Sequence, residues 1–152
     1  MDESRRSRTS DPEPSLGVLL YIPYRHMEQR ILRAVAAAGH EISLAQARVF
    51  QRIDPHGSRL TRIAESAQVS KQAAKFLVDQ LERGGYVERV ADPDDGRARM
   101  VRITARGYDV IRVATDEQNT IETEWIAHLG SPVTDELRRV LLQLREITDP
   151  YY

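Results

Sequence analysis

Apolar residues in the first quarter of the chain recur every three or four positions, the spacing of one face of a helix. The pattern runs from Ser15 to about Ala38 and predicts one long amphipathic helix. Gly39 marks its end, since glycine readily takes the left-handed conformation that closes a helix. Pro23 lies inside the pattern and should kink the helix or reset its start, because proline lacks the amide used in helical hydrogen bonding.

Three shorter helices are predicted next. Ser43–Gln46 has the Ser-x-x-Gln form of a capping box, so a second helix should begin there and run to about Ile53. A short third helix carries apolar residues at Leu60, Ile63 and Ala64. Ser70 is a good N-cap for a fourth helix, which ends at the two glycines that follow Arg83. Two short helices joined by such a tight turn are typical of a helix-turn-helix, whose second helix enters the DNA major groove.

A β-hairpin is predicted after the fourth helix. Residues 86–90 and 99–104 are rich in β-branched residues and alternate in polarity, and the turn residues Asp92–Gly96 lie between them. Thr104 can cap a fifth, long helix that breaks at residues 130–132, and a last helix follows from about Thr134 to Ile147. The sequence therefore predicts a mainly α fold with a small β-wing: a winged helix-turn-helix flanked by N- and C-terminal helices.

Composition narrows the class of protein. With 152 residues, 41% hydrophobic and 30% charged, the chain is the size of one ordinary soluble domain. It has no apolar run of membrane-spanning length and no secretory signal, so we expect a cytoplasmic protein with no membrane partner. Residues 1–14 are polar and contain prolines, which predicts a disordered tail. The chain has no cysteine, which excludes disulfides, thiolate zinc sites and iron-sulfur clusters.

Charge is distributed unevenly along the chain. Residues 58–107 carry ten Lys or Arg against seven Asp or Glu, whereas residues 108–152 carry four Arg against nine acids. The positive excess therefore coincides with the predicted helix-turn-helix and hairpin, as expected for a surface that meets DNA.

Metal and enzyme functions lack candidate residues. An EF-hand counted from Asp92 would need glycine at its sixth position and glutamate at its twelfth, where the chain has Arg97 and Ile103. The four histidines do not have the spacing of metal ligands, and no P-loop, dinucleotide fingerprint or nucleophile elbow occurs. We predict no cofactor, no metal and no enzymatic activity.

Several segments together resemble the MarR family of bacterial transcription regulators. They are Val69–Ser70, Leu77–Arg89 (LVDQLERGGYVER), Asp92–Arg99 (DPDDGRAR) and Ile103–Gly107 (ITARG). The resemblance implies a homodimer that binds a pseudo-palindromic operator in double-stranded DNA. Residues 41–104 of each chain would form the DNA-binding lobe. The resemblance further implies dimerisation through residues 15–40 and 105–152, repression of transcription, and control by a small aromatic or phenolic ligand. One departure is Gln68, where the family often has glycine, which predicts a strained or slightly reshaped turn.

The exposed face of the fourth helix supplies the candidate reading residues. Its N-terminal end carries Ser70, Lys71 and Gln72, followed by Lys75 and Phe76. Glutamine can pair bidentately with adenine, and a lysine can bind guanine or a phosphate. Phe76 is unusual because the resembling proteins carry a polar or basic residue there. It either contacts a thymine methyl group or packs under the wing or the second helix.

The hairpin supplies a second set of candidates. By the resemblance, Arg97 at its tip reaches into the minor groove, Arg99 also binds DNA, and Asp95 holds either that arginine or the loop. Gly96 stands where the family often has a second arginine.

An effector site is expected between the dimerisation helices and the DNA-binding lobe. The first helix offers Tyr21, Tyr24, Arg25 and His26, and His40 follows it. The tyrosines are equally consistent with packing in a dimer interface. A rival function is a winged-helix module that binds a protein partner without binding DNA.

Overall fold

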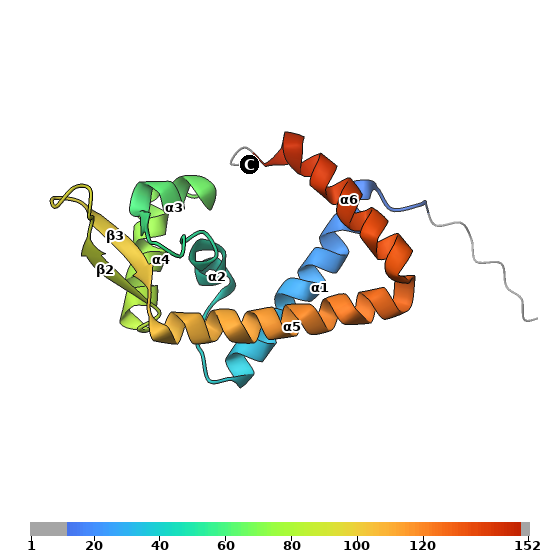
Figure 1. Cartoon of the computed structure of the whole chain (residues 1–152), viewed down its shortest axis with the longest axis horizontal. Coiled ribbons are helices and arrows are strands. Elements are labelled where there is room, and N and C mark those ends of the chain that lie inside the picture. The colour runs from blue at the N-terminus through green and yellow to red at the C-terminus, as the bar shows by residue number, and fades with distance from the viewer. Residues whose placement is uncertain (1–11, 150–152) are drawn as a thin grey trace, which may run out of the picture.

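The computed structural model describes residues 12–149. It contains six helices and a small antiparallel sheet, which confirms the predicted fold class (Figure 1). The predicted N-terminal tail falls mainly outside the described residues, and residues 12–14 are exposed and irregular. The elements are α1 Leu16–Ala37, α2 Leu44–Phe50, β1 Ser58–Arg59, α3 Leu60–Ser66, α4 Lys71–Arg83, β2 Val87–Ala91, β3 Arg99–Ile103, α5 Ala105–Leu129 and α6 Ser131–Thr148.

The long helix α5 connects the two ends of the molecule. Figure 1 shows α2, α3, α4 and the sheet gathered at its N-terminal end, while α6 folds back from its C-terminal end toward the start of α1. Helix α1 crosses α5 and packs against it. No helix within residues 12–149 is long and apolar enough to cross a membrane.

The helix boundaries follow the caps that the sequence provides. The capping box at α2 is complete: Ser43 N donates to Gln46 Oε1 at 2.8 Å, and Gln46 N donates to Ser43 Oγ at 3.2 Å. Helix α2 ends at Phe50, before the expected Ile53, because the chain tightens into turns and buries Ile53 in the core. Helix α1 starts at Leu16 and runs through Pro23, so the proline does not reset the helix start.

The sheet has three strands in the order β1-β3-β2, one more than the predicted hairpin. Strands β2 and β3 pair from Val87↔Ile103 to Ala91↔Arg99, as expected for the wing. The additional strand β1 pairs Ser58 with Val101. Two residues are too few to show the alternating pattern that identifies a strand in a sequence.

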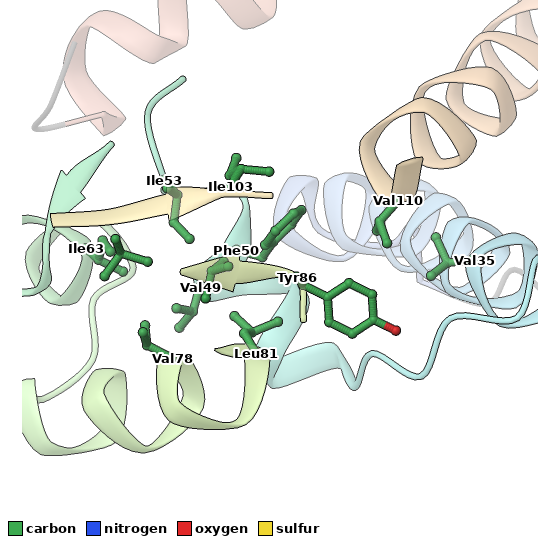
Figure 2. Close-up of a cluster of buried hydrophobic side chains, with 12 residues drawn as sticks. Val35, Val49, Phe50, Ile53, Ile63, Val78, Leu81, Tyr86, Ile103 and Val110 are labelled. Carbon is green, nitrogen blue, oxygen red and sulfur yellow. The ribbon is translucent and has the colours of Figure 1, made fainter. Parts of the chain in front are cut away.

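The core lies where α2, α3, α4 and the sheet meet the first turns of α5 (Figure 2). Ile63, Val78 and Leu81 are almost completely buried, and Phe50 and Tyr86 fill the space toward α1 and α5. This core fixes the helix-turn-helix against the wing.

Helix α5 leaves the core at a close backbone contact. Thr104 caps the helix by accepting a hydrogen bond from Gly107 N at 3.1 Å, and its hydroxyl donates to Gly85 O at 2.6 Å. A Cβ added at Gly107 would lie 2.3 Å from Tyr86 O and 2.7 Å from Ile103 Cγ2. Only a residue without a side chain fits here, because the nearest atom belongs to the backbone.

We expect Gly107→Ala to lower the free energy of unfolding by about 1–3 kcal/mol, since the added methyl group overpacks the joint. Gly96→Ala is the matched control: no described atom lies within 4 Å of a Cβ placed there, so its effect should stay within about 0.5 kcal/mol. Urea unfolding followed by circular dichroism measures both. Equal stability of the two variants would contradict the close contact.

Candidate nucleic-acid interface

The face of α4 opposite the core carries the predicted reading residues. Ala74, Val78 and Leu81 are buried, so the helix is fixed in rotation, and Ser70 caps it by accepting a hydrogen bond from Ala73 N at 3.1 Å. All five predicted contacts at this helix are exposed to solvent; they are Ser70, Lys71, Gln72, Lys75 and Phe76. The structure thus brings them together on one accessible surface.

Phe76 projects into solvent. It is 59% exposed, which excludes the alternative in which it packs under the wing or α2. An aromatic side chain at this position on the reading helix is available to an apolar group of a binding partner.

A network of charges joins α4 to β2. Lys75 Nζ lies 2.8 Å from Asp79 Oδ2, and the guanidinium of Arg89 contacts both Asp79 and Glu82. Hydrogen bonds from Lys75 and then Arg89 hold the pKa of Asp79 below its usual range. Both acids of α4 are therefore compensated by cations, which lowers their repulsion toward a polyanion. The i, i+4 spacing of Lys75 and Asp79 indicates the first pair, but nothing in the sequence indicates that Arg89 joins it.

The wing presents two arginines. Arg97 and Arg99 are exposed, and their guanidinium groups form no ion pair with any described residue. Asp95 Oδ1 accepts a hydrogen bond from Arg97 N at 3.1 Å. Of the two expected roles for Asp95, holding the arginine or holding the loop, the structure shows the second.

Asp92 is the buried anchor of the wing, a role that sequence reasoning missed. It is 5% exposed, and its carboxylate accepts hydrogen bonds from Asp94 N at 2.9 Å and from Arg59 Nε at 2.6 Å. Its own amide donates to Ala98 O at 3.0 Å and closes the loop. The Asp-Pro-Asp order is typical of such an Asx turn, but the ion pair with β1 depends on tertiary structure.

The turn between α3 and α4 is strained, as predicted. Gln68 has φ 57°, the left-handed conformation that a glycine would take at little cost. For a residue with a side chain this conformation costs about 1–2 kcal/mol. The turn still closes, with Val69 N donating to Ala64 O at 3.0 Å.

Two cavities lie near the predicted effector residues. One, of about 370 Å³, is lined by residues of α1, α2, α5 and β3 and is partly open to solvent. The other, of about 850 Å³, lies between α1, α5 and α6. Tyr24 lines both, whereas Tyr21 lines only the larger one, together with Trp125.

The remaining predicted effector residues lie elsewhere. Arg25 and His26 line neither cavity, and the Arg25 guanidinium lies 5.4 Å from the ring centre of Tyr21. His40 is buried after the end of α1, where its Nε2 is 2.8 Å from Asp109 Oδ2 of α5 and its ring meets Tyr86 edge-on. The structure therefore does not gather the five residues into one pocket.

Comparison with known proteins finds a family whose sequence pattern matches part of this chain. The model of the MarR family matches residues 40–98, which span the helix-turn-helix and the wing. Over this segment the chain is similar to the MarR family. Members of that family are transcription regulators and not enzymes.

Curated proteins with similar sequences are named as transcription regulators. The transcriptional repressor MprA of Escherichia coli K12 is 25% identical over 146 residues, covering 92% of this chain and 82% of that one. The repressor Rv2887 of Mycobacterium tuberculosis is 30% identical over 88 residues, 58% of this chain and 63% of that one. BilQ of Clostridioides difficile is 25% identical over 59% of each chain, so the match spans less than two thirds of these last two relatives.

Solved structures share the fold. The crystal structure of MarR superposes with a TM-score of 0.72 at 22% identity, covering 91% of this chain and 93% of that one. A mutant of Staphylococcus aureus MepR bound to an oligodeoxyribonucleotide gives a TM-score of 0.59 at 18% identity, covering 88% and 98%.

The wing anchor predicts a specific acid sensitivity. The amide of Asp94, and then the Arg59 guanidinium, hold the pKa of Asp92 below its usual range. A lowered folded-state pKa contributes stability that is present above the unfolded value of about 3.9 and is lost as the pH falls through the folded value. Denaturant unfolding between pH 7 and pH 5 should therefore be unaffected by this group, with stability falling below about pH 4.

Asp92→Asn should lower the free energy of unfolding at pH 7, since the amide cannot replace the charged acceptor. It should also reduce the further loss of stability below about pH 4, because the substituted side chain does not titrate. The neighbouring exposed residue provides the control, and Asp94→Asn should keep the acid decline of the unsubstituted protein. Parallel pH profiles for the unsubstituted protein and Asp92→Asn would show that the ion pair does not anchor the wing.

Proposed function

We propose that the chain binds a pseudo-palindromic DNA operator as a homodimer and represses transcription, and that a small aromatic or phenolic ligand relieves the repression. The observation that carries the proposal is the surface shared by α4 and the wing. It presents exposed polar reading residues on a fixed helix and, beside them, arginines that form no ion pair with a described residue.

The reading helix and the wing would contact different grooves. The N-terminal end of α4 enters the major groove, where Gln72 can pair with adenine and Lys71 can bind guanine or a phosphate. Lys75 is already paired with Asp79, which favours Lys71 as the stronger contact. Phe76 is exposed and can meet a thymine methyl group. Arg97 reaches the minor groove, and Arg99 adds a phosphate contact.

A second subunit would cover the other end of the molecule. Helix α6, every residue of which is described, contains no buried residue, yet it carries Leu137, Leu141 and Leu144 at helical spacing. The start of α1 is similarly apolar and exposed. Large exposed apolar surfaces of this kind mark sites of association, and a two-fold dimer would bury both together. The dimer would also present two wings to one operator.

The cavity of about 370 Å³ is the proposed effector site. It lies between the dimerisation helices and the DNA-binding lobe, and Tyr24 contributes an aromatic group to its wall. Among structures of similar fold, MepR of Staphylococcus aureus has been solved bound to ethidium bromide. A ligand that fits one arrangement of helices and lobe better than another would shift DNA affinity by the difference in its binding to the two.

The protein-interaction module remains the rival function, and the exposed Phe76 is the feature that favours it. Anisotropy titration against fragments of the source genome at two salt concentrations separates the two functions. Displacement of counterions by lysines and arginines gives DNA affinity a steep negative dependence on salt. Absence of binding to every fragment would support the protein partner.

Arg97→Ala should weaken operator binding by about 1–3 kcal/mol, because the wing loses its minor-groove contact. Arg112→Ala removes the same charge from α5, where the arginine is paired with Asp109 at 2.7 Å, and should leave affinity nearly unchanged. Fluorescence anisotropy at physiological salt measures both. Equal affinities of Arg97→Ala and the unsubstituted protein would overturn the assignment of the wing.

Leu141→Glu should convert the dimer to monomers, since it places a charge in the proposed apolar interface. Gln143→Glu adds the same charge at an exposed polar position of the same helix and should stay dimeric. Sedimentation velocity at micromolar concentration distinguishes the two states. A monomeric unsubstituted protein, or a dimeric Leu141→Glu variant, would contradict dimerisation through α6.

A further inference from the structure

The wall of the proposed effector cavity carries a negative charge and, among the described residues, no positive charge. Its wall is mostly aliphatic and aromatic, supplied by α1, α2, α5 and β3. Among the described residues that line it, Glu28 is the one with a formal charge, and no lysine or arginine contributes to the wall. A cavity lined in this way disfavours an anion, because a buried negative charge there would meet a carboxylate and find no cation.

Glu28 is held in the cavity wall by two partners from different directions. Its side chain is 13% exposed, Tyr24 Oη donates to its Oε1 at 3.2 Å, and Arg48 Nε lies 3.2 Å from the same oxygen. Burial raises the pKa of Tyr24, and the neighbouring carboxylate raises it further, so the tyrosine keeps its proton and donates it. The Arg48 side chain is 55% exposed, so that end of the ion pair faces solvent.

This ion pair also joins the two parts of the molecule. Glu28 belongs to α1, whereas Arg48 belongs to α2 of the DNA-binding lobe. Arg30, half a turn along α1, is tied instead to α5, through Glu117 at 2.7 Å and through Glu124. Loss of the contact between Glu28 and Arg48 would therefore loosen α2 from α1 while α1 stays attached to α5.

We propose that the ligand of this cavity is an aromatic cation, an amine or quaternary ammonium, whose charge takes the place of Arg48 at Glu28. The inference rests on the proposed effector site and specifies the ligand class: a cation, not an aromatic acid. The exchange leaves no charge unpaired, because the exposed Arg48 returns to water as the ligand cation meets the partly buried carboxylate of Glu28. It also explains how binding would reach the DNA-binding lobe, since the ligand replaces the contact that joins α2 to α1.

Three probes of similar size and different charge test the ligand class. Isothermal titration of the full-length protein with benzyltrimethylammonium, neutral neopentylbenzene and 3-phenylpropanoate compares cation, neutral molecule and acid. We expect the cation to bind at least about tenfold more tightly than the acid, because the cation forms an ion pair with Glu28 whereas the acid meets a like charge. Equal or tighter binding of 3-phenylpropanoate would overturn the proposal.

Two substitutions with opposite expected effects test the exchange. Glu28→Gln should weaken binding of the cation about tenfold while leaving the neutral probe unchanged. Arg48→Gln should strengthen binding of the cation severalfold, because Glu28 no longer has a competing partner. Unchanged cation affinity in both variants would refute the exchange.

Each variant has a control that makes the same change of charge. Glu41→Gln removes an exposed negative charge near the junction of α1 and α2 but outside the cavity wall. Arg52→Gln removes a positive charge one turn beyond Arg48, and none of the ion pairs of the described residues includes it. Both controls should bind the cation like the unsubstituted protein. Effects equal to those of Glu28→Gln and Arg48→Gln would reduce the result to long-range electrostatics and contradict the proposal.

The DNA assay separates this inference from the proposed function. Benzyltrimethylammonium should lower operator affinity of the unsubstituted protein and leave that of Glu28→Gln unchanged. If the protein binds the operator but the cation neither binds the protein nor weakens operator binding, the ligand class is refuted and the DNA-binding function is left intact. Cation binding without any operator binding would refute the DNA-binding function and support the charge preference of the cavity.

Discussion

The rest of the structure depends on the backbone contact at the start of α5. Gly107 lies so close to Tyr86 O that no side chain fits between the helix and the end of the reading-helix segment. Thr104 ties the same helix start to Gly85. Because this contact sets the direction in which α5 leaves the lobe, it also sets where α1 and α6 lie relative to α4 and the wing (Figure 1). The contact between Gly107 and Tyr86 thus helps to determine how the surface of α4 and the wing is oriented relative to α1 and α6.

Much of the fold could be predicted because local signals agree with tertiary packing. The caps at Ser43, Ser70 and Thr104 and the apolar spacing of α4 each specify an element by themselves. The strand β1 could not be predicted, since its two residues are a strand only because β3 lies beside them. The end of α2 was placed too late because Arg52 and Ile53 donate to carbonyls three residues back, a tighter turn that the apolar spacing does not distinguish from α-helix.

The sequence predicts which residues of the candidate site are exposed better than it predicts their ion-pair partners. Exposure of Lys71, Gln72 and Phe76 follows from helical periodicity once the buried face is known. The partners of Arg89 lie on α4, across the turn that precedes β2, and the partner of Asp92 lies on the distant strand β1, so no spacing rule within one element reveals them. The same holds for Glu28, which resembles any surface acid in the sequence and lies in a cavity wall only because α2, α5 and β3 line the same cavity as α1.

Helix α6 gives the molecule a property that its contacts alone do not show. A helix of 18 residues that buries none of them in its own subunit draws little stability from that subunit, since most of the stability of a helix in a protein comes from packing of its apolar face. With the dimer proposed above, ordering of this end becomes a bimolecular equilibrium governed by mass action. The amount of functional regulator in a cell would then rise faster than in proportion to the amount of chain synthesised. A change in expression level would act as a signal in its own right.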